Sequence, residues 1–315
     1  MKKYAIVSIL LCLAVAATAK HIHKKDRKSE PSAATAKPAN DTASSKKSVK
    51  PYNKVITDKA ITKYGLFTVH KVEDKWYFEI ADSLMNKEMI VTTRYSKTAG
   101  GGGVYAGEMV NNQTILWEKG PNNNVFLRVV TVISKADSTN EIYKAVTNSN
   151  LNPIAQAFDI KAYGKDSASV VIDVSDFFKG DNQPISLGEF SKRRFNLSSQ
   201  VADRSYIRNI NTYLINTEVR VVRTFNSTPS FMPSSTPGPF PSTTLPAAYA
   251  AGAVTLEMNN SFVLLPKVPM KKRMFDPRVG FFADDYVVYN DRQQKVENNI
   301  FIRSEEHTSE LQSQR

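Results

Sequence analysis

Four histidines and one cysteine are the side chains of this sequence best suited to hold a metal ion or to act as a strong nucleophile. The histidines are His21, His23, His70 and His307. A hydrolytic zinc site needs about three protein ligands, but the chain contains no H-E-x-x-H motif. The sequence therefore predicts no catalytic residue and no metal ligand, and we interpret His70 as a cross-strand side chain. His21 and His23 could together chelate copper or nickel, although two solvated histidines are the simpler interpretation.

The densest group of charges lies in PMKKRMFDPRVGFF, residues 269–282. Pro277 restricts the backbone beside Asp276, so this carboxylate could form a charge-assisted pair with a nearby arginine. We interpret Arg273, Asp276 and Arg278 as candidates for docking another domain. The alternative is a solvated loop before a strand, because most surface charges contribute little.

Two other patterns resemble catalytic motifs, but their context does not support that interpretation. The stretch AGGGGVYAGE, residues 99–108, lacks the Gly-Lys-Ser/Thr of a phosphate-binding loop and lies between strand patterns, so we expect a flexible connector. No Gly-x-Ser-x-Gly nucleophile turn accompanies His70. The carboxylates have no spacing that selects a glycosidase pair, and we interpret them as surface charges and turn caps. They include Asp159, Asp173, Asp176, Asp284 and Asp285.

The elements that must position these residues are mostly strands. Apolar residues alternate at Phe67 and Val69, and again at Phe78 and Ile80, on either side of a polar turn at 73–75. Helix patterns are few and short, chiefly around 138–149. The sequence therefore predicts a mainly β, antiparallel fold with a few short helices. Further strand patterns are KEMIVTTRYSKT, SASVVIDVS, NTEVRVVRTF, GAVTLEMNNSFVLLP and RVGFFADDYVVYN, and a hairpin is expected about Gly120-Pro121-Asn122.

Composition divides the chain into segments. We expect a small β domain over 51–98 and a larger β-rich domain over 99–302. Within the larger one, residues 226–252 are rich in Pro and Ser and predict a long surface loop. Residues 20–50 have almost nothing to bury and predict a disordered tether.

The start of the chain has the features of a signal peptide. MKKYAIVSILLCLAVAATA combines a basic start, an apolar run and an Ala-x-Ala end, so we expect removal of residues 1–19 and export to the periplasm, the cell surface or the medium. The run is short for a spanning helix, which disfavours the alternative of a lone membrane anchor and predicts no transmembrane segment after cleavage. Cys12 lies in this leader, so we expect no disulfide in the mature chain.

The positive charge is concentrated outside the folded region. The net charge is +12, but much of the surplus lies in the leader and in 20–50. The mild surplus that remains over 51–302 is typical of a solvated surface, so we expect no nucleic-acid partner.

Several long motifs together resemble one family. They are KAITKYGLFTVHKVEDKWYFEIADSL, TAGGGGVYAGEMVNNQ, TLEMNNSFVLLP and PMKKRMFDPRVGFF. Over about residues 52–302 the chain resembles the N-terminal half of secreted bacterial zinc-dependent metalloproteases of the met-zincin type. The resemblance implies two domains of unknown function that precede a catalytic domain with H-E-x-x-H, two zinc-binding histidines and a glutamate base. No position here matches that motif, so zinc is expected only in the missing domain and this fragment is expected to be inactive.

The last stretch, RSEEHTSELQSQR at 303–315, matches the translation of a short-read sequencing adapter. We therefore expect these residues to be an artefact, the native protein to be truncated after Ile302, and His307 to have no role. The alternative is a native polar tail.

These observations leave more than one function open. The first is a non-catalytic region of a truncated secreted metalloprotease, which scaffolds or positions the missing zinc domain. Its partners would be that domain and the peptide or protein substrate of the parent enzyme. The second is a β-rich binding module of the cell envelope for a polypeptide, a glycan or a protein. A self-sufficient hydrolase that uses carboxylates is the third.

Overall fold

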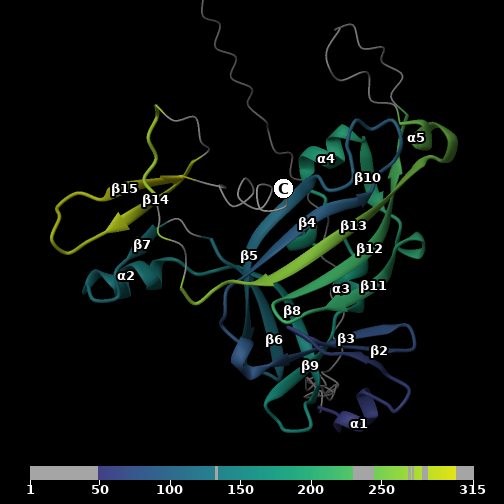
Figure 1. Ribbon diagram of the computed structural model, residues 1–315, viewed down its shortest axis with the longest axis horizontal. Helices are drawn as coiled ribbons and strands as arrows, with labels where there is room; N and C mark the ends of the chain where they lie inside the picture. Colours follow the sequence, from purple (N-terminus) through teal and green to yellow (C-terminus); the bar gives the residue numbers. More distant parts are fainter. Residues whose placement is uncertain are drawn as a thin grey trace, which may run out of the picture. The chain divides into compact units, whose positions relative to one another are not determined.

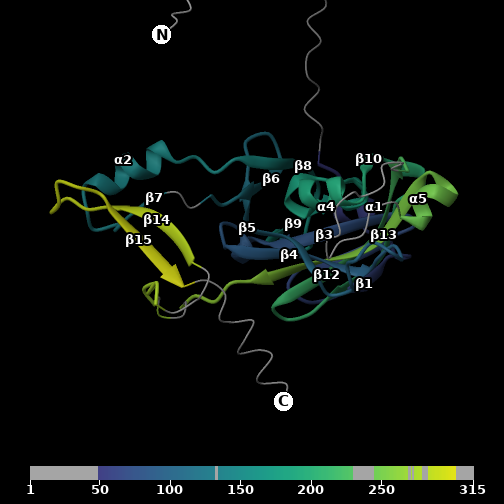
Figure 2. The same ribbon diagram turned by 90° about the horizontal axis from the view of Figure 1, so that it is seen from above.

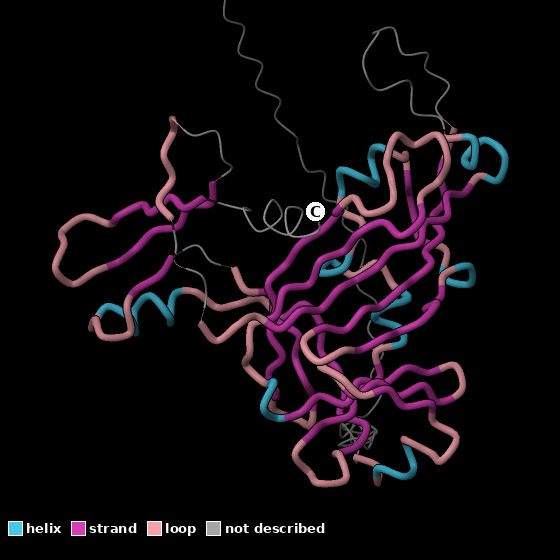
Figure 3. Tube along the Cα trace, in the orientation of Figure 1, coloured by secondary structure: helices cyan, strands magenta, loops and turns pink. Residues whose placement is uncertain are grey.

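The computed structural model describes residues 49–131, 134–229, 245–268, 271, 273–278 and 283–302. Strands dominate this part of the chain and the helices are short (Figure 3). The predicted mainly antiparallel β fold is therefore confirmed. The predicted signal peptide, nearly all of the predicted tether, and residues 303–315 lie outside the described residues, as do His21, His23 and His307.

The larger of two sheets has twelve strands. Its order is β1-β2-β3-β9-β8-β6-β5-β4-β13-β12-β10, and β11 also pairs with β12. Figure 1 shows β4, β13 and β12 running side by side. The strand bounds are β1 Ile61–Lys63, β2 Thr68–Val72, β3 Lys75–Ala81, β4 Met89–Lys97, β5 Met109–Lys119, β6 Asn124–Val129, β8 Ile154–Tyr163, β9 Ser169–Asp173, β10 Leu197–Gln200, β11 Tyr206–Thr212, β12 Asn216–Ser227 and β13 Ala253–Leu264.

The predicted hairpins form where the turn residues indicate. β2 and β3 pair antiparallel around Glu73, which adopts a φ of 53°. β5 and β6 pair antiparallel around the Gly-Pro-Asn stretch at 120–122, where Asn122 has a φ of 61°. Non-glycine residues with positive φ are uncommon, and asparagine adopts this conformation more readily than most. Strand pairing also joins the two predicted domain ranges, because β3 pairs with β9 and β4 pairs with β13.

The two ends of the larger sheet approach each other. The Leu66 amide donates to the Tyr213 carbonyl at 2.5 Å, and the Thr212 hydroxyl donates to the Phe67 carbonyl at 3.0 Å. Lys63 Nζ donates to the Ile210 carbonyl at 2.9 Å. These contacts connect the β1–β2 loop with the end of β11, so the sheet is nearly closed.

Aromatic side chains pack together in the core of the larger sheet. Phe67, Phe78, Phe178 and Phe262 are fully buried. The ring centroids of Phe67 and Phe78 are 4.9 Å apart, and those of Phe78 and Phe178 are 5.5 Å apart. Phe178 comes from α3, Ser175–Lys179, a short helix that follows β9. Burying a side chain of this size stabilises a fold by about 1.5–3 kcal/mol, so the cluster is a major source of stability.

The opposite face of β3 is buried as well. Tyr77 lies on that face, next to its cross-strand partner His70 of β2, and both are almost inaccessible to solvent. Tyr77 packs in a second cluster with Val55, Ile56 and Val171, of which Val55 belongs to α1, Tyr52–Val55. Alternation of apolar and polar residues predicts a strand with one buried face. In β3 both faces are buried, so the pattern predicts less burial than the structure has.

A separate sheet has three strands in the order β15-β14-β7. β14 pairs antiparallel with β15 and parallel with β7. The bounds are β7 Ser134–Ala136, β14 Ala283–Tyr289 and β15 Glu297–Ile302. α2, Ile142–Ser149, contacts β7 and β14 and confirms the helix expected around 138–149 (Figure 2).

The prediction of an irregular loop over 226–252 is wrong at both of its described ends. β12 continues to Ser227, and residues 246–251 form α5, Pro246–Ala251. Proline at the first turn and a run of alanines favour this helix, and Gly252 ends it at a φ of 60°. Leu245 and Ala248 are buried, which anchors the helix on the core. Residues 230–244 lie outside the described residues.

The remaining helices are short. They are α4 Glu189–Arg194 and the single-turn 3₁₀ helices η1 Asp82–Leu84, η2 Gln183–Ile185 and η3 Ala202–Arg204. Within the described part of the chain, no helix has the length and apolar character needed to cross a membrane.

Candidate functional site

The predicted docking residues lie next to the three-stranded sheet. Phe275 N donates to the Ile300 carbonyl at 2.9 Å, and Ile302 N donates to the Arg273 carbonyl at 3.0 Å. Met274 forms an antiparallel bridge with Phe301. Residues 273–275 therefore extend the sheet along the outer edge of β15.

Asp276 and Arg278 form the expected pair within one turn. Arg278 Nη2 donates to Asp276 Oδ2 at 2.5 Å, Arg278 Nε donates to Oδ1 at 2.9 Å, and the Arg278 amide donates to Oδ1 at 3.0 Å. The side-chain and backbone hydrogen bonds from Arg278 lower the pKa of Asp276. The Arg278 side chain is 86% exposed. The structure thus brings all three predicted residues to one edge of the three-stranded sheet and presents a guanidinium to solvent.

The three-stranded sheet buries little of its own surface. No residue of β7, β14 or β15 is fully buried. On one face, Tyr286 stacks on Phe301 at 5.3 Å between ring centroids, and Lys135 Nζ lies 5.1 Å from the Tyr286 ring. On the other, a cavity of about 400 Å³ separates β14 from α2 and is lined by Val287 and Tyr289. The strands of this sheet thus carry aromatic and aliphatic side chains that are only partly covered.

His70 is a buried cross-strand side chain, as predicted. Its Nε2 lies 2.9 Å from Glu79 Oε2, and its Nδ1 lies 2.8 Å from Thr62 Oγ1. Glu79 also accepts hydrogen bonds from Tyr52 at 3.0 Å and from Ser169 at 2.6 Å. The hydrogen bond from His70 lowers the pKa of Glu79 most; burial opposes it, and Ser169 and Tyr52 add to the lowering. Both imidazole nitrogens are satisfied within the fold, which is the arrangement of a structural histidine.

A second buried polar network escaped the sequence analysis. Arg223 is fully buried in β12, where its Nη1 donates to the Ile185 carbonyl at 2.8 Å and lies 3.3 Å from Asp181 Oδ1. The other Asp181 oxygen lies 2.7 Å from Lys192 Nζ. Burial lowers the pKa of Arg223 to about 10, against the attraction of Asp181. The guanidinium therefore keeps its charge at neutral pH inside the fold.

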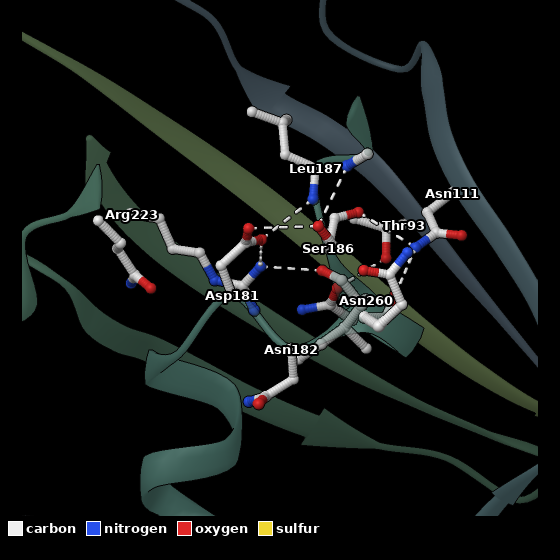
Figure 4. Close-up of polar contacts among 12 residues, drawn as sticks. Thr93, Asn111, Asp181, Asn182, Ser186, Leu187, Arg223 and Asn260 are labelled. Carbon is white, nitrogen blue, oxygen red and sulfur yellow. Dashed lines mark hydrogen bonds and ion pairs between the residues drawn. The ribbon is translucent and has the colours of Figure 1, made fainter. Parts of the chain in front are cut away.

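This network fixes the segment at 180–188 onto the sheet (Figure 4). Asp181 accepts hydrogen bonds from the Leu187 amide at 3.1 Å and from the Ser186 hydroxyl at 3.2 Å. Asn111 of β5 donates to the Gln183 carbonyl at 2.9 Å and to the Ser186 carbonyl at 3.2 Å. The arrangement positions a loop, and of the buried guanidinium only Nε has no hydrogen-bond partner among the described residues.

The glycine stretch is a connector between two antiparallel strands. It joins β4 to β5, which pair with each other. Gly101 and Gly103 adopt φ values of 85° and 63°, and a Cβ on Gly102 would lie 2.7 Å from the Phe195 ring. This confirms that the stretch connects two strands. Glycine is needed there for backbone conformation and close packing.

The carboxylates act as pairs and caps. Asp159 Oδ2 lies 3.2 Å from Lys161 Nζ. Asp173 accepts a hydrogen bond from the Ser175 amide at 3.0 Å at the start of α3, and pairs with Lys75 at 3.1 Å. Among the described residues, no group of three or more His, Cys, Asp or Glu side chains could hold a metal ion.

A cavity beside α1 measures about 620 Å³. Lysines and carboxylates both line it, together with Tyr77. Its charged residues are Lys50, Lys54, Glu73, Lys75, Asp159, Lys161 and Asp173. A site of this composition would hold a polar ligand that carries charges of both signs.

Two protein-family models match the chain, and both describe domains of unknown function. The DUF5118 model matches residues 49–98, and the DUF5117 model matches residues 107–304. Comparisons with curated protein sequences and with solved structures give no match. Because the second model covers more than half of the sequence, the chain belongs to the DUF5117 family of domains of unknown function.

Proposed function

We propose that this chain is an exported, non-catalytic region of a secreted zinc-dependent metalloprotease, and that it positions the catalytic zinc domain through the three-stranded sheet. The observation that carries the proposal is the absence of a fully buried residue in all three strands of that sheet. A three-stranded sheet is stabilised by a layer packed on its hydrophobic face. The helix α2 supplies one such layer on β7 and β14, and the proposed partner would supply another.

The chemistry of the three-stranded sheet fits a protein partner. Tyr286 and Phe301 offer a stacked aromatic pair, and aromatic residues are enriched at protein interfaces. Arg278 adds an exposed guanidinium that Asp276 holds in position, so it can form a charge-assisted bond without losing much side-chain freedom. In this proposal zinc and the peptide substrate bind to the catalytic domain. The resemblance of the four long motifs to metalloproteases suggests that this domain carries H-E-x-x-H.

The test starts with the locus, read from clean DNA past the codon for Ile302, and with expression of the complete protein. We expect an H-E-x-x-H domain, and casein hydrolysis that falls in Tyr286→Asp and Arg278→Glu while bound zinc stays at the wild-type ratio. Arg220→Glu, at an exposed position of β12, is the matched control and should leave hydrolysis unchanged. A continuation without H-E-x-x-H, or full activity in both sheet variants, would contradict the proposal.

The cavity beside α1 favours a second candidate, an envelope binding module. Its volume of about 620 Å³ suits a small ligand, and its paired charges suit a short peptide with both termini free. Calorimetric titration with short peptides would detect such binding, and Lys54→Glu should weaken it. Binding in the absence of any zinc domain at the locus would make this the better function.

A further inference from the structure

The helix α2 and the strands that it contacts leave a cavity between them. This cavity has a volume of about 400 Å³, and α2 lies beside β7 and β14 (Figure 2). Protein interiors are close-packed, and voids larger than a water molecule are few. The volume falls within the range of about 300–1,000 Å³ that is usual for ligand pockets. The residues that line the cavity are Ser134, Ile142, Ala145, Val146, Ser149, Asn150, Val287 and Tyr289.

One face of the helix and one face of the strands form the walls. The four residues that α2 contributes have the i, i+3, i+4, i+7 spacing of a single helix face. Val287 and Tyr289 are two positions apart in β14 and point to the same side of the sheet, and Ser134 of β7 pairs with Val287. Ala145 and Ser149 are exposed although they line the cavity. The cavity therefore opens to solvent along this side of the helix.

Hydrogen bonds hold both ends of α2 in place. At its start, the Glu141 and Ile142 amides donate to the Asp291 carboxylate at 2.5 and 3.1 Å. Asp291 belongs to the turn between β14 and β15. At its end, Asn150 Nδ2 donates to Ser134 Oγ of β7 at 2.9 Å. These contacts fix the spacing between the helix and the strands, so the cavity is a preformed part of the structure.

The chemistry of the wall selects an uncharged, apolar ligand. None of the described residues that line the cavity carries a charge. The Ser149 hydroxyl donates to the Ala145 carbonyl at 2.8 Å, and Asn150 Nδ2 also donates to the Val146 carbonyl at 2.6 Å. Because these polar groups are engaged within the protein, a charged or peptide-like ligand would give up its hydrogen bonds to water without new partners. The cavity beside α1 differs in this respect, since lysines and carboxylates line it.

We infer that the cavity beneath α2 is a binding site for a small uncharged molecule with an aromatic or branched aliphatic body. An engineered apolar cavity of about 150 Å³ in another protein binds benzene, so a cavity of about 400 Å³ accommodates such a ring. The ligand would contact Val146 on the helix and Val287 on the strand, and the burial of apolar surface would drive its binding. This inference does not depend on the proposed role of the three-stranded sheet in docking.

The experiment is calorimetric titration of the full chain with indole, an uncharged aromatic probe, and with indole-3-acetate, its anionic counterpart. We expect indole to bind at one site. Indole-3-acetate should bind at least about ten-fold more weakly, because its carboxylate finds no charged partner in the wall.

A variant that fills the cavity tests the position of the site. Ala145→Leu places an apolar side chain at the mouth of the cavity and should lower the affinity for indole about ten-fold or more. Leucine favours helix formation, so the urea midpoint should stay at or above the wild-type value. Thr147→Leu is the matched control, since Thr147 is an exposed residue of α2 that does not line the cavity, and it should bind indole as the wild type does.

Three results would overturn the inference. They are no binding of indole to the wild-type chain, equal affinity in wild type and Ala145→Leu, and an equal loss of affinity in Thr147→Leu. The same titration on the complete protein provides a further check. Indole that binds this chain but not the complete protein would assign the cavity to an apolar side chain of another domain and not to a free molecule.

Discussion

The two sheets of this protein bury their side chains to very different extents. In the larger sheet, β3 is covered on both faces, and phenylalanines from β3, α3 and β13 meet in one core. In the three-stranded sheet, the aromatic pair Tyr286 and Phe301 is only partly covered, and a cavity remains under α2. The contrast suggests that the larger sheet supplies the stability of the fold and the smaller one supplies a surface.

The largest effect should come from truncating the core of the larger sheet. Phe78→Ala removes a ring that stacks on Phe67 and contacts Phe178 and Phe262, so it should lower the free energy of unfolding by about 3–5 kcal/mol. Phe301→Ala is the counterpart in the three-stranded sheet and should cost about 1 kcal/mol, the value of one aromatic pair. Urea denaturation followed by tryptophan fluorescence measures both. Equal losses of unfolding free energy in the two variants would contradict the proposed difference between the sheets.

A slightly smaller loss is expected when the buried ion pair is broken. Asp181→Ala leaves the guanidinium of Arg223 in the core without its carboxylate, which should cost about 3 kcal/mol. Because the cost comes from an unpaired buried charge, Asp181→Ala with Arg223→Met should recover part of the stability. Asp203→Ala, at an exposed position in η3, is the control. A double variant as unstable as the sum of the two single variants would contradict this explanation.

The network around Glu79 should make the larger sheet sensitive to acid. The folded pKa of Glu79 lies below its ordinary value of 4.5, chiefly because of the hydrogen bond from His70. Its contribution is therefore present above the unfolded-state pKa and is lost as the pH falls through the folded-state pKa. Wild type should exceed Glu79→Gln in stability at neutral pH, and the two should converge as the pH falls through the lowered folded-state pKa of Glu79.

Urea titrations at several pH values measure this difference. Glu73→Gln, in the exposed turn between β2 and β3, is the control and should follow the wild-type profile. A constant gap between wild type and Glu79→Gln across the acid range would show that Glu79 acts through packing and not through its charge.

Local patterns predict the strands of the larger sheet well where alternation is regular. Phe67, Val69, Phe78 and Ile80 are all buried as the pattern indicates. β11 was not predicted, and its register shifts between Ile207 and Asn209, which interrupts the alternation.

The buried arginine shows what the sequence could and could not reveal. Side chains of every second residue in a strand point to the same face of the sheet. Arg223 therefore lies on the same face of β12 as the buried residues Val219, Val221 and Phe225. A buried guanidinium requires a carboxylate, but Asp181 is far away in the sequence and nothing local selects it. The docking residues differ in this respect, because Asp276 and Arg278 are two positions apart and proline restrains the turn. Short-range pairs can be predicted from spacing, whereas long-range pairs depend on the folded topology.

The smallest expected effect on stability comes from Asp276→Ala, which tests most directly whether the three-stranded sheet contributes to the stability of the fold. Asp276→Ala removes the partner of Arg278, but the pair is exposed to solvent, where ion pairs contribute little. The urea midpoint of this chain should therefore stay at the wild-type value within error. The proposed function predicts that in the complete protein the same change lowers casein hydrolysis at unchanged zinc content, because Arg278 would lose the contact that orients it toward the proposed partner domain. Lys144→Ala, an exposed change in α2, should alter neither property. A lowered midpoint in the isolated chain would mean that the Asp276 turn belongs to the folded core, and the three-stranded sheet would then be a stable part of the fold.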